Sequence, residues 1–531
     1  MIILDFFEFF SRSLHIGVKG GQDSYMSDFA YDENRTKGAH PYVPPYQDAP
    51  LNAAAMESIF ADCGDFQTRE LDIGLAGKAA ATAVWLDGVV DGGSVTDAVF
   101  RPVTEGARFA AAKTSAQCVA LIMGGGAYAN TAAVYETAAE TADALTHGWC
   151  ALIFDDIGQA VCFEVRTTST RGISQPSVEK SVKGAKDSFV ETLRTNTSLV
   201  RRRIATPKLK LKSTVIGRKS LTRCAVMYVD GVADPEVVDE LLSRLDAIDV
   251  DGLNASGRIE GYIVDAPKSP FPQVIHTERP DRFAMQLLNG RVGLIADGIP
   301  MGFLVPASPP EFMRVLQDRT DNYIVSSMLS VLRYAALFIS LTLPAFFTAI
   351  AMYHQEMIPV KLLLSVVQAK QDVPFSVAFE VISMLISFGL LQEAALRLPD
   401  PVGNTVSIIG ALIVGQSAVE AKIVSPIAVI VVALAGICTY ALPNQDISSA
   451  VRLWRMLLVM CAVFAGLFGV SAGLCILGWY LCGIESYGVN YLSPISSGNP
   501  GGIFKALLRV PQAANKFRDP DLRTPDRRRQ H

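Results

Sequence analysis

The chain has 531 residues, a mean hydropathy of +0.29 and only 19% charged residues. This balance is typical of a partly membrane-embedded protein rather than of a soluble one. The formal net charge of −5 is small and acidic, which argues against nucleic acid as a main partner.

The first ten residues, MIILDFFEFF, do not read as a signal peptide, because they lack a basic start and carry Asp5 and Glu8 among the aromatic residues. We expect a short amphipathic element followed by polar, proline-rich chain, so residues 1–60 are predicted to form a variable, flexible N-terminal segment. Without a cleaved signal, the soluble half is expected to stay on the cytoplasmic side. Nine scattered cysteines without a CxxC pair indicate free thiols in a reducing compartment.

The soluble half contains an internal repeat. An apolar run that ends in Asp-Gly, with a second aspartate four residues after the first, occurs twice, as VWLDGVVD at 84–91 and MYVDGVAD at 227–234. Each copy predicts a strand, a turn that the aspartates cap, and then a helix.

The second part of each unit repeats as well, as GWCALIFD at 148–155 and GRVGLIAD at 290–297, and both copies predict β-hairpins. The spacing agrees, since 68 residues separate Asp87 from Asp155 and 67 separate Asp230 from Asp297. We therefore predict tandem duplicated α/β subdomains, cytoplasmic, over residues 61–183 and 207–322.

The repeat also decides whether one apolar stretch is a membrane span or part of the soluble half. Residues 287–306 are apolar enough to suggest a membrane span, but their counterpart lies far from any membrane run, so a soluble hairpin is expected. Residues 184–206 between the two units predict an amphipathic connecting helix, with Phe189, Leu193 and Val200 beside a basic cluster. Its charged side is interpreted as a solvated face, with contact to a partner or a lipid headgroup as the alternative.

Residues 323–485 predict an all-α polytopic transmembrane domain, because a span needs about 20 apolar residues and several such runs occur. The predicted runs are 327–352, 374–396, 406–442 and 456–482, the last long and uninterrupted. The third is too long for one span. Either two spans meet there, or residues 406–419 form a re-entrant piece before a span over 423–442.

Orientation follows from the basic residues. The tail, residues 486–531, carries eight Lys/Arg from Lys505 onward against three Asp, so both ends of the domain are expected to be cytoplasmic and the number of crossings even. We predict four full spans plus a re-entrant segment, with six crossings as the alternative. Arg452 and Arg455 fit poorly, because this count places them on the outside, where they would snorkel to the interface.

Ser376, Glu380, Ser383 and Ser387 fall within a sector of roughly 60° on one helix. A carboxylate on a serine stripe suits either a hydrated pore pathway or a static interhelical hydrogen-bond network, and both interpretations stay open.

Other charged residues in these runs favour local roles. Glu393 lies four residues before Arg397, which predicts an ion pair at the end of a span. Glu420 and Lys422 predict either a charged turn at the membrane surface or a functional site in a broken helix.

Small residues form one narrow face of the last run, at Ala462, Gly466, Gly469 and Gly473. Such a face lets helices approach closely, within the chain or between subunits.

No catalytic motif, cofactor motif or metal-like His/Cys spacing is found, so no enzyme, cofactor or metal is predicted. A secondary transporter is disfavoured, because the membrane half shows no inverted repeat.

Ordered strings along the chain resemble the A subunits of spore germinant receptors. The strings are GAKDSFVETLRTNTSLVR at 184–201, SPFPQ at 269–273, TERPD at 277–281, LNGRVGLIADG at 288–298, PFSVAFE at 374–380, LLQEAALRLP at 390–399, VGQSAVEA at 414–421 and SYGVNYLSP at 486–494. Asn289 and Asn490 depart from the pattern, which leaves the subgroup open between a receptor A subunit and the A-subunit-like protein associated with the dipicolinate channel operon.

The resemblance implies a multi-pass subunit of the spore inner membrane. It would act with a transporter-like B subunit that binds the germinant and with a lipoprotein C subunit, to trigger the release of cations and then of dipicolinate. The family's A subunits are expected to form homo-oligomers whose helices line a ligand-gated cation path. A non-conducting scaffold of the same receptor is the alternative function.

Overall fold

The computed structural model describes residue 46 and residues 49–529, except 74–78, 110–111, 113, 128–130, 168–175, 177–178, 180–182, 253–255, 398–414, 498–499 and 512–513. It divides into two units, Met1–Asp48 and Ala49–His531, and every element named below belongs to the second. The predicted flexible segment 1–60 therefore lies mostly outside the described residues.

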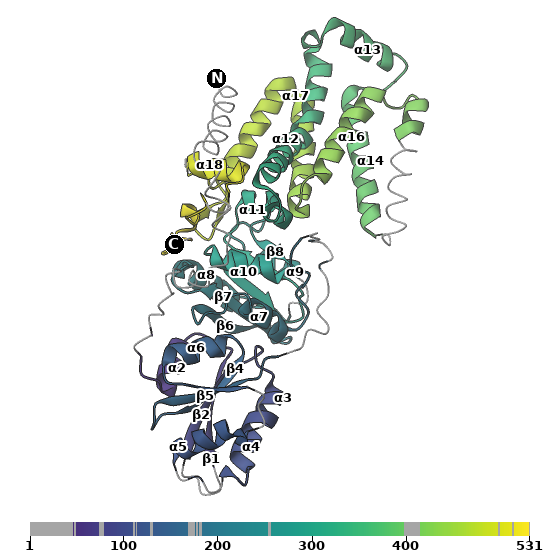
Figure 1. Cartoon of the computed structure of the whole chain (residues 1–531). Coiled ribbons are helices and arrows are strands. Elements are labelled where there is room, and N and C mark those ends of the chain that lie inside the picture. Colours follow the sequence, from purple (N-terminus) through teal and green to yellow (C-terminus); the bar gives the residue numbers. More distant parts are fainter. Residues whose placement is uncertain are drawn as a thin grey trace, which may run out of the picture. The chain divides into compact units, whose positions relative to one another are not determined.

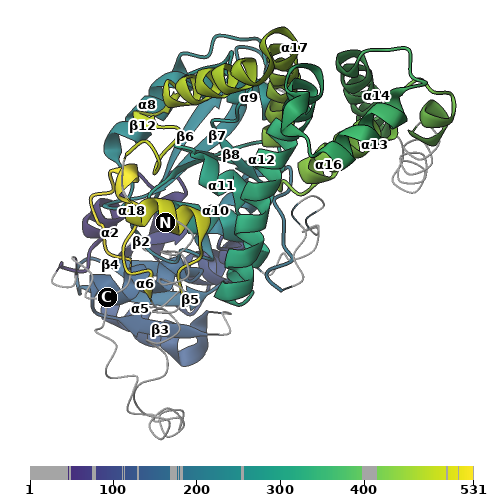
Figure 2. The ribbon, with the colours of Figure 1, turned by 90° about the horizontal axis from the view of Figure 1, so that it is seen from above.

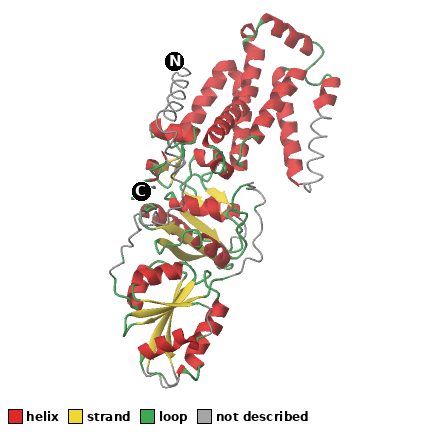
Figure 3. Cartoon of the chain, viewed as in Figure 1, coloured by secondary structure: helices red, strands yellow, loops and turns green. Residues whose placement is uncertain are grey.

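The part of the chain before residue 323 forms two α/β subdomains (Figures 1 and 3). The strands are β1 (Phe66–Ile73), β2 (Ala79–Leu86), β3 (Ala132–Tyr135), β4 (Trp149–Phe154), β5 (Gln159–Glu164), β6 (Leu209–Ile216), β7 (Thr222–Val229), β8 (Ile275–Thr277), β9 (Val292–Ala296) and β10 (Gly302–Val305). The helices are α2 (Ala53–Ile59), α3 (Gly92–Val95), α4 (Arg101–Glu105), α5 (Ser115–Leu121), α6 (Ala138–Thr146), α7 (Leu193–Arg201), α8 (Pro235–Asp246), α9 (Ser256–Ile263), α10 (Pro280–Leu288) and α11 (Pro309–Met313).

The two sheets have the same topology. The first has the strand order β1-β2-β4-β5-β3 and the second β6-β7-β9-β10-β8, and all neighbouring strands are antiparallel. The predicted hairpins are β4–β5 and β9–β10, and the apolar stretch 287–306 contains the second of them. The duplication inferred from sequence is confirmed strand by strand.

The aspartates of the repeat cap helices, as expected for turn residues. Asp91 accepts a hydrogen bond from the Ser94 N–H at the start of α3, and Asp234 accepts one from the Glu236 N–H at the start of α8. Each hairpin aspartate also holds the first helix of its own subdomain. Asp155 accepts from the backbone N–H of Ala53 in α2 (2.9 Å), and Asp297 accepts from that of Leu193 in α7 (2.9 Å).

Helix α7 is therefore the counterpart of α2 and belongs to subdomain 2, which corrects the prediction of a connecting helix with a solvated basic face. Arg201 at its end is 0% exposed and makes a bidentate ion pair with Asp65, at 2.7 and 3.0 Å. A third hydrogen bond runs from Arg201 to the carbonyl of Leu209 (2.7 Å). Since Asp65 directly precedes β1, this buried pair joins the two subdomains.

The two subdomains differ in their cores. One hydrophobic cluster lies wholly within subdomain 1, from Leu71 to Val165. The equivalent face of the second sheet has its own cluster, which lies within subdomain 2 from Ile216 to Val305 and adds only Tyr487. The opposite face of that sheet, which carries α7 and α10, belongs to a third cluster that continues into the helical region, from Phe189 through Leu341 to Tyr491. Both subdomains therefore have a core of their own on one face of the sheet, and subdomain 2 is packed onto the helices through its other face.

The helical region follows subdomain 2 (Figures 1 and 3). Its elements are α12 (Tyr323–Tyr353), α13 (Val360–Lys370), α14 (Val377–Arg397), α16 (Pro426–Tyr440), α17 (Gln445–Cys482), the short strands β11 (Glu485–Ser486) and β12 (Val489–Asn490), and α18 (Pro500–Leu507). Among the described residues, three helices are long and apolar enough to cross a membrane, namely α12, α14 and α17. The overall fold is thus the predicted one, tandem α/β subdomains followed by an all-α region.

Helix α16 is shorter than the predicted span over 423–442. It has 15 residues, a rise of about 22 Å, whereas a bilayer core is about 30 Å thick. Residues 398–414, which hold most of the expected re-entrant piece, lie outside the described part of the chain.

Helix α17 is broken, which corrects the prediction of an uninterrupted span over 456–482. Ala465 and Gly466 leave helical geometry, with φ of −136° and +58°. The two halves then fold back on each other, since a methyl group on Gly473 would lie 2.6 Å from Leu458. The element is a helical hairpin.

Both ends of this hairpin reach subdomain 2. Phe271, in the loop before β8, has ring contacts with Trp454 in the first half of α17 (6.5 Å between centroids) and with Tyr480 in the second (6.4 Å). Trp454 and Tyr480 also contact each other, at 5.6 Å. The turn at Gly466 lies instead at the far end of α12, where a methyl group on it would be 3.2 Å from Tyr353.

Candidate functional site in the helical region

Glu380 is fully buried near the start of α14 and connects three helices. Its Oε2 accepts a hydrogen bond from the backbone N–H of Ser425 (2.8 Å), the residue that caps the N-terminus of α16. Its Oε1 lies 3.9 Å from the ammonium group of Lys370 at the end of α13 and has no hydrogen-bond partner among the described residues. A carboxylate here suits the positive end of the α16 dipole.

The serines of the predicted stripe bond to the backbone of their own helix. Ser383 donates to the carbonyl of Glu380 (3.0 Å), Ser387 donates to that of Ser383 (2.8 Å), and Ser376 accepts from the N–H of Phe379 (3.3 Å). Within the described chain, none of these hydroxyl groups is hydrogen-bonded to the Glu380 carboxylate.

A second buried polar cluster lies near the other end of α16. Arg455 of α17 is 6% exposed and donates to Thr439 Oγ1 (3.1 Å), Ser340 Oγ (3.4 Å) and the carbonyl of Ala435 (3.5 Å). Ser340 and Thr439 are themselves 2.6 Å apart. Within the described residues no carboxylate pairs with this arginine. The prediction that Arg455 snorkels to an interface is wrong, because it is buried among α12, α16 and α17.

Arg452, one turn earlier, is more exposed and joins α17 to α14 through Gln392 Oε1 (3.1 Å). Helices α14 and α16 run in the same direction, because Glu380 contacts Ser425 at one end and Phe388 packs on Gly436 further along (Figure 1). The short helix α16 is thus held near both ends by buried charged side chains.

The remaining charged candidates are Glu393 with Arg397, near the end of α14, and Glu420 with Lys422, before α16. Glu393 is exposed on α14, and the side chain of Arg397 lies outside the described residues, so that ion pair stays a prediction. Glu420 accepts from Gln416 (3.0 Å), whereas Lys422 pairs with Asp372 after α13 (2.6 Å). Glu420 and Lys422 therefore flank an exposed turn before α16.

The small-residue face of α17 lies at the hairpin. Ala462, Gly466, Gly469 and Gly473 are all buried, and the glycines approach Tyr353, Cys461 and Leu458 of the same chain. Only glycine adopts the backbone of Gly466 at low cost, because its φ is positive. A contact of this face with another subunit stays a prediction.

The joint between subdomain 2 and the helices was not foreseen. His276 of β8 lies 2.9 Å from the Asp446 carboxylate in the first turn of α17. After α17, Ser486 Oγ donates to the carbonyl of Gln273 (3.3 Å), and the Tyr487 hydroxyl donates to that of Ile263 (2.7 Å). The start of α17 is therefore on the side of subdomain 2, which disagrees with the expectation that Arg452 and Arg455 lie outside.

No group of three or more His, Cys, Asp or Glu that could hold a metal ion occurs among the described residues.

Comparison with known proteins gives the family. The family model described as "Bacillus/Clostridium GerA spore germination protein" matches residues 54–520. Among curated proteins of Bacillus subtilis, the chain is similar to the uncharacterized membrane protein YfkQ (38% identity, 72% of this chain and 75% of that one). It is also similar to spore germination protein KA, with 38% identity over 72% of this chain and 70% of that one. Spore germination protein A1 is 34% identical over 71% of this chain and 78% of its own length.

A solved structure is similar as well, the N-terminal domain of the A subunit of the Bacillus megaterium spore germinant receptor GerK3. It is 29% identical, with 48% of this chain and 92% of that chain covered and a TM-score of 0.37. With a family match that extends across both subdomains, the helical region and most of the tail, the chain belongs to the GerA spore germination protein family.

Proposed function

We propose that this chain is the A-type membrane subunit of a spore germinant receptor that responds to nutrient germinants. It would lie in the spore inner membrane with its α/β subdomains in the cytoplasm, and act with B and C subunits as a homo-oligomer. The names of its relatives and the three apolar helices support this role.

We further propose that it gates a cation path and that α16 is the moving part. The proposal rests on the Glu380 carboxylate. It is buried between α13, α14 and α16, and one of its oxygens makes no hydrogen bond in the described chain. Buried ionisable groups at membrane depth are costly and commonly mark ion or substrate paths. Displacement of α16 would expose this carboxylate to a cation.

A non-conducting scaffold is the second candidate, and a specific contact favours it. The hydrogen bond from Ser425 to Glu380 is what a static helix cap needs, and the stripe serines are satisfied within α14.

Cation flux through the protein reconstituted into liposomes separates the two. Glu380→Gln keeps the size of the side chain and removes its charge, so a conducting subunit should lose most of its flux while its oligomeric state is unchanged. Glu420→Gln, the same change at an exposed turn residue, should leave the flux as it is. Unchanged flux in Glu380→Gln with intact assembly would reject the pore and leave the scaffold.

A further inference from the structure

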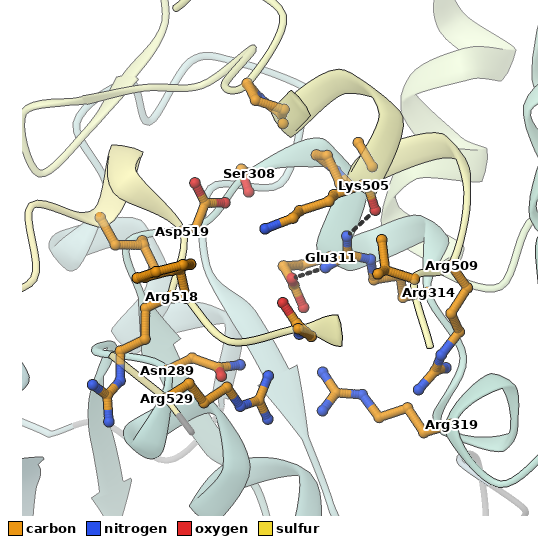
Figure 4. A pocket seen from close by; sticks show the side chains of 18 of the residues that line it. Asn289, Ser308, Glu311, Arg314, Arg319, Lys505, Arg509, Arg518, Asp519 and Arg529 are labelled. Atoms are coloured by element: carbon orange, nitrogen blue, oxygen red, sulfur yellow. Dashed lines mark hydrogen bonds and ion pairs between the residues drawn. The ribbon is translucent and has the colours of Figure 1, made fainter. Parts of the chain in front are cut away.

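A large pocket lies where subdomain 2, the start of α12 and the tail meet. Its volume is about 850 Å³. It is lined by α11, by the chain that leads into α12, by α18 and by the residues after α18 (Figure 4). Seen from above, α18 lies beside α11, and Arg314 donates to the carbonyl of Lys505 in α18 at 2.8 Å (Figure 2).

The lining is strongly basic. Its cationic side chains are Arg291, Arg314, Arg319, Lys505, Arg509, Arg518, Arg527 and Arg529, and its carboxylates are Glu311, Asp318 and Asp519. The excess of positive charge comes from chain segments about 200 residues apart in sequence.

Two of the three carboxylates are already engaged. Glu311 accepts from Arg314 (2.7 Å) and from Gln286 (2.6 Å). Asp318 makes a bidentate pair with Arg333 of α12, at 2.5 and 2.8 Å, and Arg333 is not part of the lining. These carboxylates therefore leave little negative charge for the tail arginines.

Two half-buried arginines of the tail have no directly paired carboxylate in the described chain. Within the described chain, the guanidinium groups of Arg509 and Arg529 make no hydrogen bond or ion pair. Figure 4 shows Arg529 directed toward Arg319, with Arg509 beside them. Burial and the neighbouring guanidinium groups lower the pKa of both tail arginines, and burial lowers the pKa of Arg319 to about 10. All three still carry their charge at neutral pH.

Like charges gathered in a partly buried pocket are costly unless an anion joins them. Several guanidinium groups that converge match the oxygens of a phosphate better than those of a single carboxylate. The volume is also within the range of small-molecule sites, about 300–1,000 Å³.

We propose that this pocket binds a phosphate-bearing anion, with Arg509 and Arg529 as its principal ligands and Lys505 at its side. The phosphate can belong to the headgroup of an anionic phospholipid or to a soluble phosphate ester, because the pocket adjoins the first turn of α12. In either case the anion connects the tail to the start of the first long apolar helix. This site is independent of the proposed cation path.

The test uses the full-length protein in a neutral detergent. Pyrophosphate binding is measured by calorimetry at constant ionic strength, and phosphatidylglycerol binding by native mass spectrometry against phosphatidylcholine. Saturable binding of pyrophosphate, of phosphatidylglycerol, or of both is expected, and the ligand that binds identifies the source of the phosphate. Arg509→Gln/Arg529→Gln should weaken that binding at least about tenfold, since two charge-assisted contacts are lost.

The matched control is Lys516→Gln/Arg528→Gln, which removes the same charge from tail residues outside the lining and should leave affinity unchanged. The ligand-free pocket variant should melt no lower than the native protein, because it loses like-charge repulsion. Absence of binding by both probes, equal affinity of the two double variants, or a pocket variant that melts several degrees lower would overturn the proposal.

Discussion

The two α/β subdomains share a strand order but differ in what their sheets pack against. One face of each sheet has a core of its own, but the other face of the second sheet shares a core with the helical region. In the second copy, the duplicated unit therefore also packs against the helices, through the face that carries α7 and α10. The difference shows that the second copy is packed against the helical region.

Equivalent positions show how the copies diverged. Phe283 of α10 packs against Gly293 of β9, so a methyl group on that glycine would collide with the ring. The equivalent positions in subdomain 1 are Thr141 and Ala151, both buried. Subdomain 1 therefore has a smaller side chain on the helix and a larger one on the strand than subdomain 2. The two copies fill the same space with different side chains.

The largest expected effect concerns the pair that joins the subdomains. Asp65→Ala leaves Arg201 buried without a counter-charge, which should cost about 3–5 kcal/mol. Native-state hydrogen exchange of α7 and β6 measures this as a loss of opening free energy. Asp87→Ala, which breaks an exposed pair with Arg194 between the same regions, should cost about 0–1 kcal/mol. Similar losses in both variants would mean that the buried pair does not hold the subdomains together.

The exchanged packing predicts an intermediate effect. Gly293→Ala should destabilise subdomain 2 by about 1–3 kcal/mol, because the added methyl group overpacks the Phe283 ring. Phe283→Leu should recover part of that loss in the double variant, as hydrogen exchange of β9 would show. If Gly293→Ala has no effect alone, the two copies do not differ in packing as described.

The smallest expected effect concerns the His276–Asp446 contact of the joint, whose place in subdomain 1 is taken by Val134. The hydrogen bond to Asp446 raises the pKa of His276 above its usual value of about 6.5, with Glu260 and Arg282 the other charged groups nearby. A raised pKa in the folded protein means that the contact stabilises fully below about pH 6.5. The stabilisation disappears as pH rises through the higher folded value.

His276→Gln should therefore lower stability by about 0.5–1 kcal/mol at pH 5.5 and by nothing at high pH, since Asp446 is half-exposed and solvent screens the pair. Melting temperatures of both proteins across pH 5–9 provide the measurement. A difference that grows with pH would contradict the assignment, and Asp446→Asn should give the same pH profile as His276→Gln.

Self-similarity was enough to predict the subdomains, because the aspartate-capped turns recur at fixed spacing and each hairpin keeps its own apolar pattern. The hairpin in α17 was not predicted from the sequence. Gly466 has the spacing of a helix-packing face, and the sequence does not show that its φ is positive. Glu380 was identified as a candidate from the serines at helical spacing around it. Its hydrogen-bond partner is the backbone N–H of Ser425, and a backbone contact cannot be recognised from residue types. The basic pocket was missed because the positive-inside rule already accounted for the tail charges.

The central claim is that α17 begins and ends on subdomain 2, and the sidedness of its first turn tests this most directly. Single cysteines at Ser449, Arg218 and Glu356 can be labelled with an impermeant thiol reagent in oriented vesicles, with the exposed Cys475 and Cys482 replaced by serine. The structure predicts that position 449 reacts from the same side as position 218 of subdomain 2, and position 356 from the opposite side. Reaction of positions 449 and 356 from one side would contradict it.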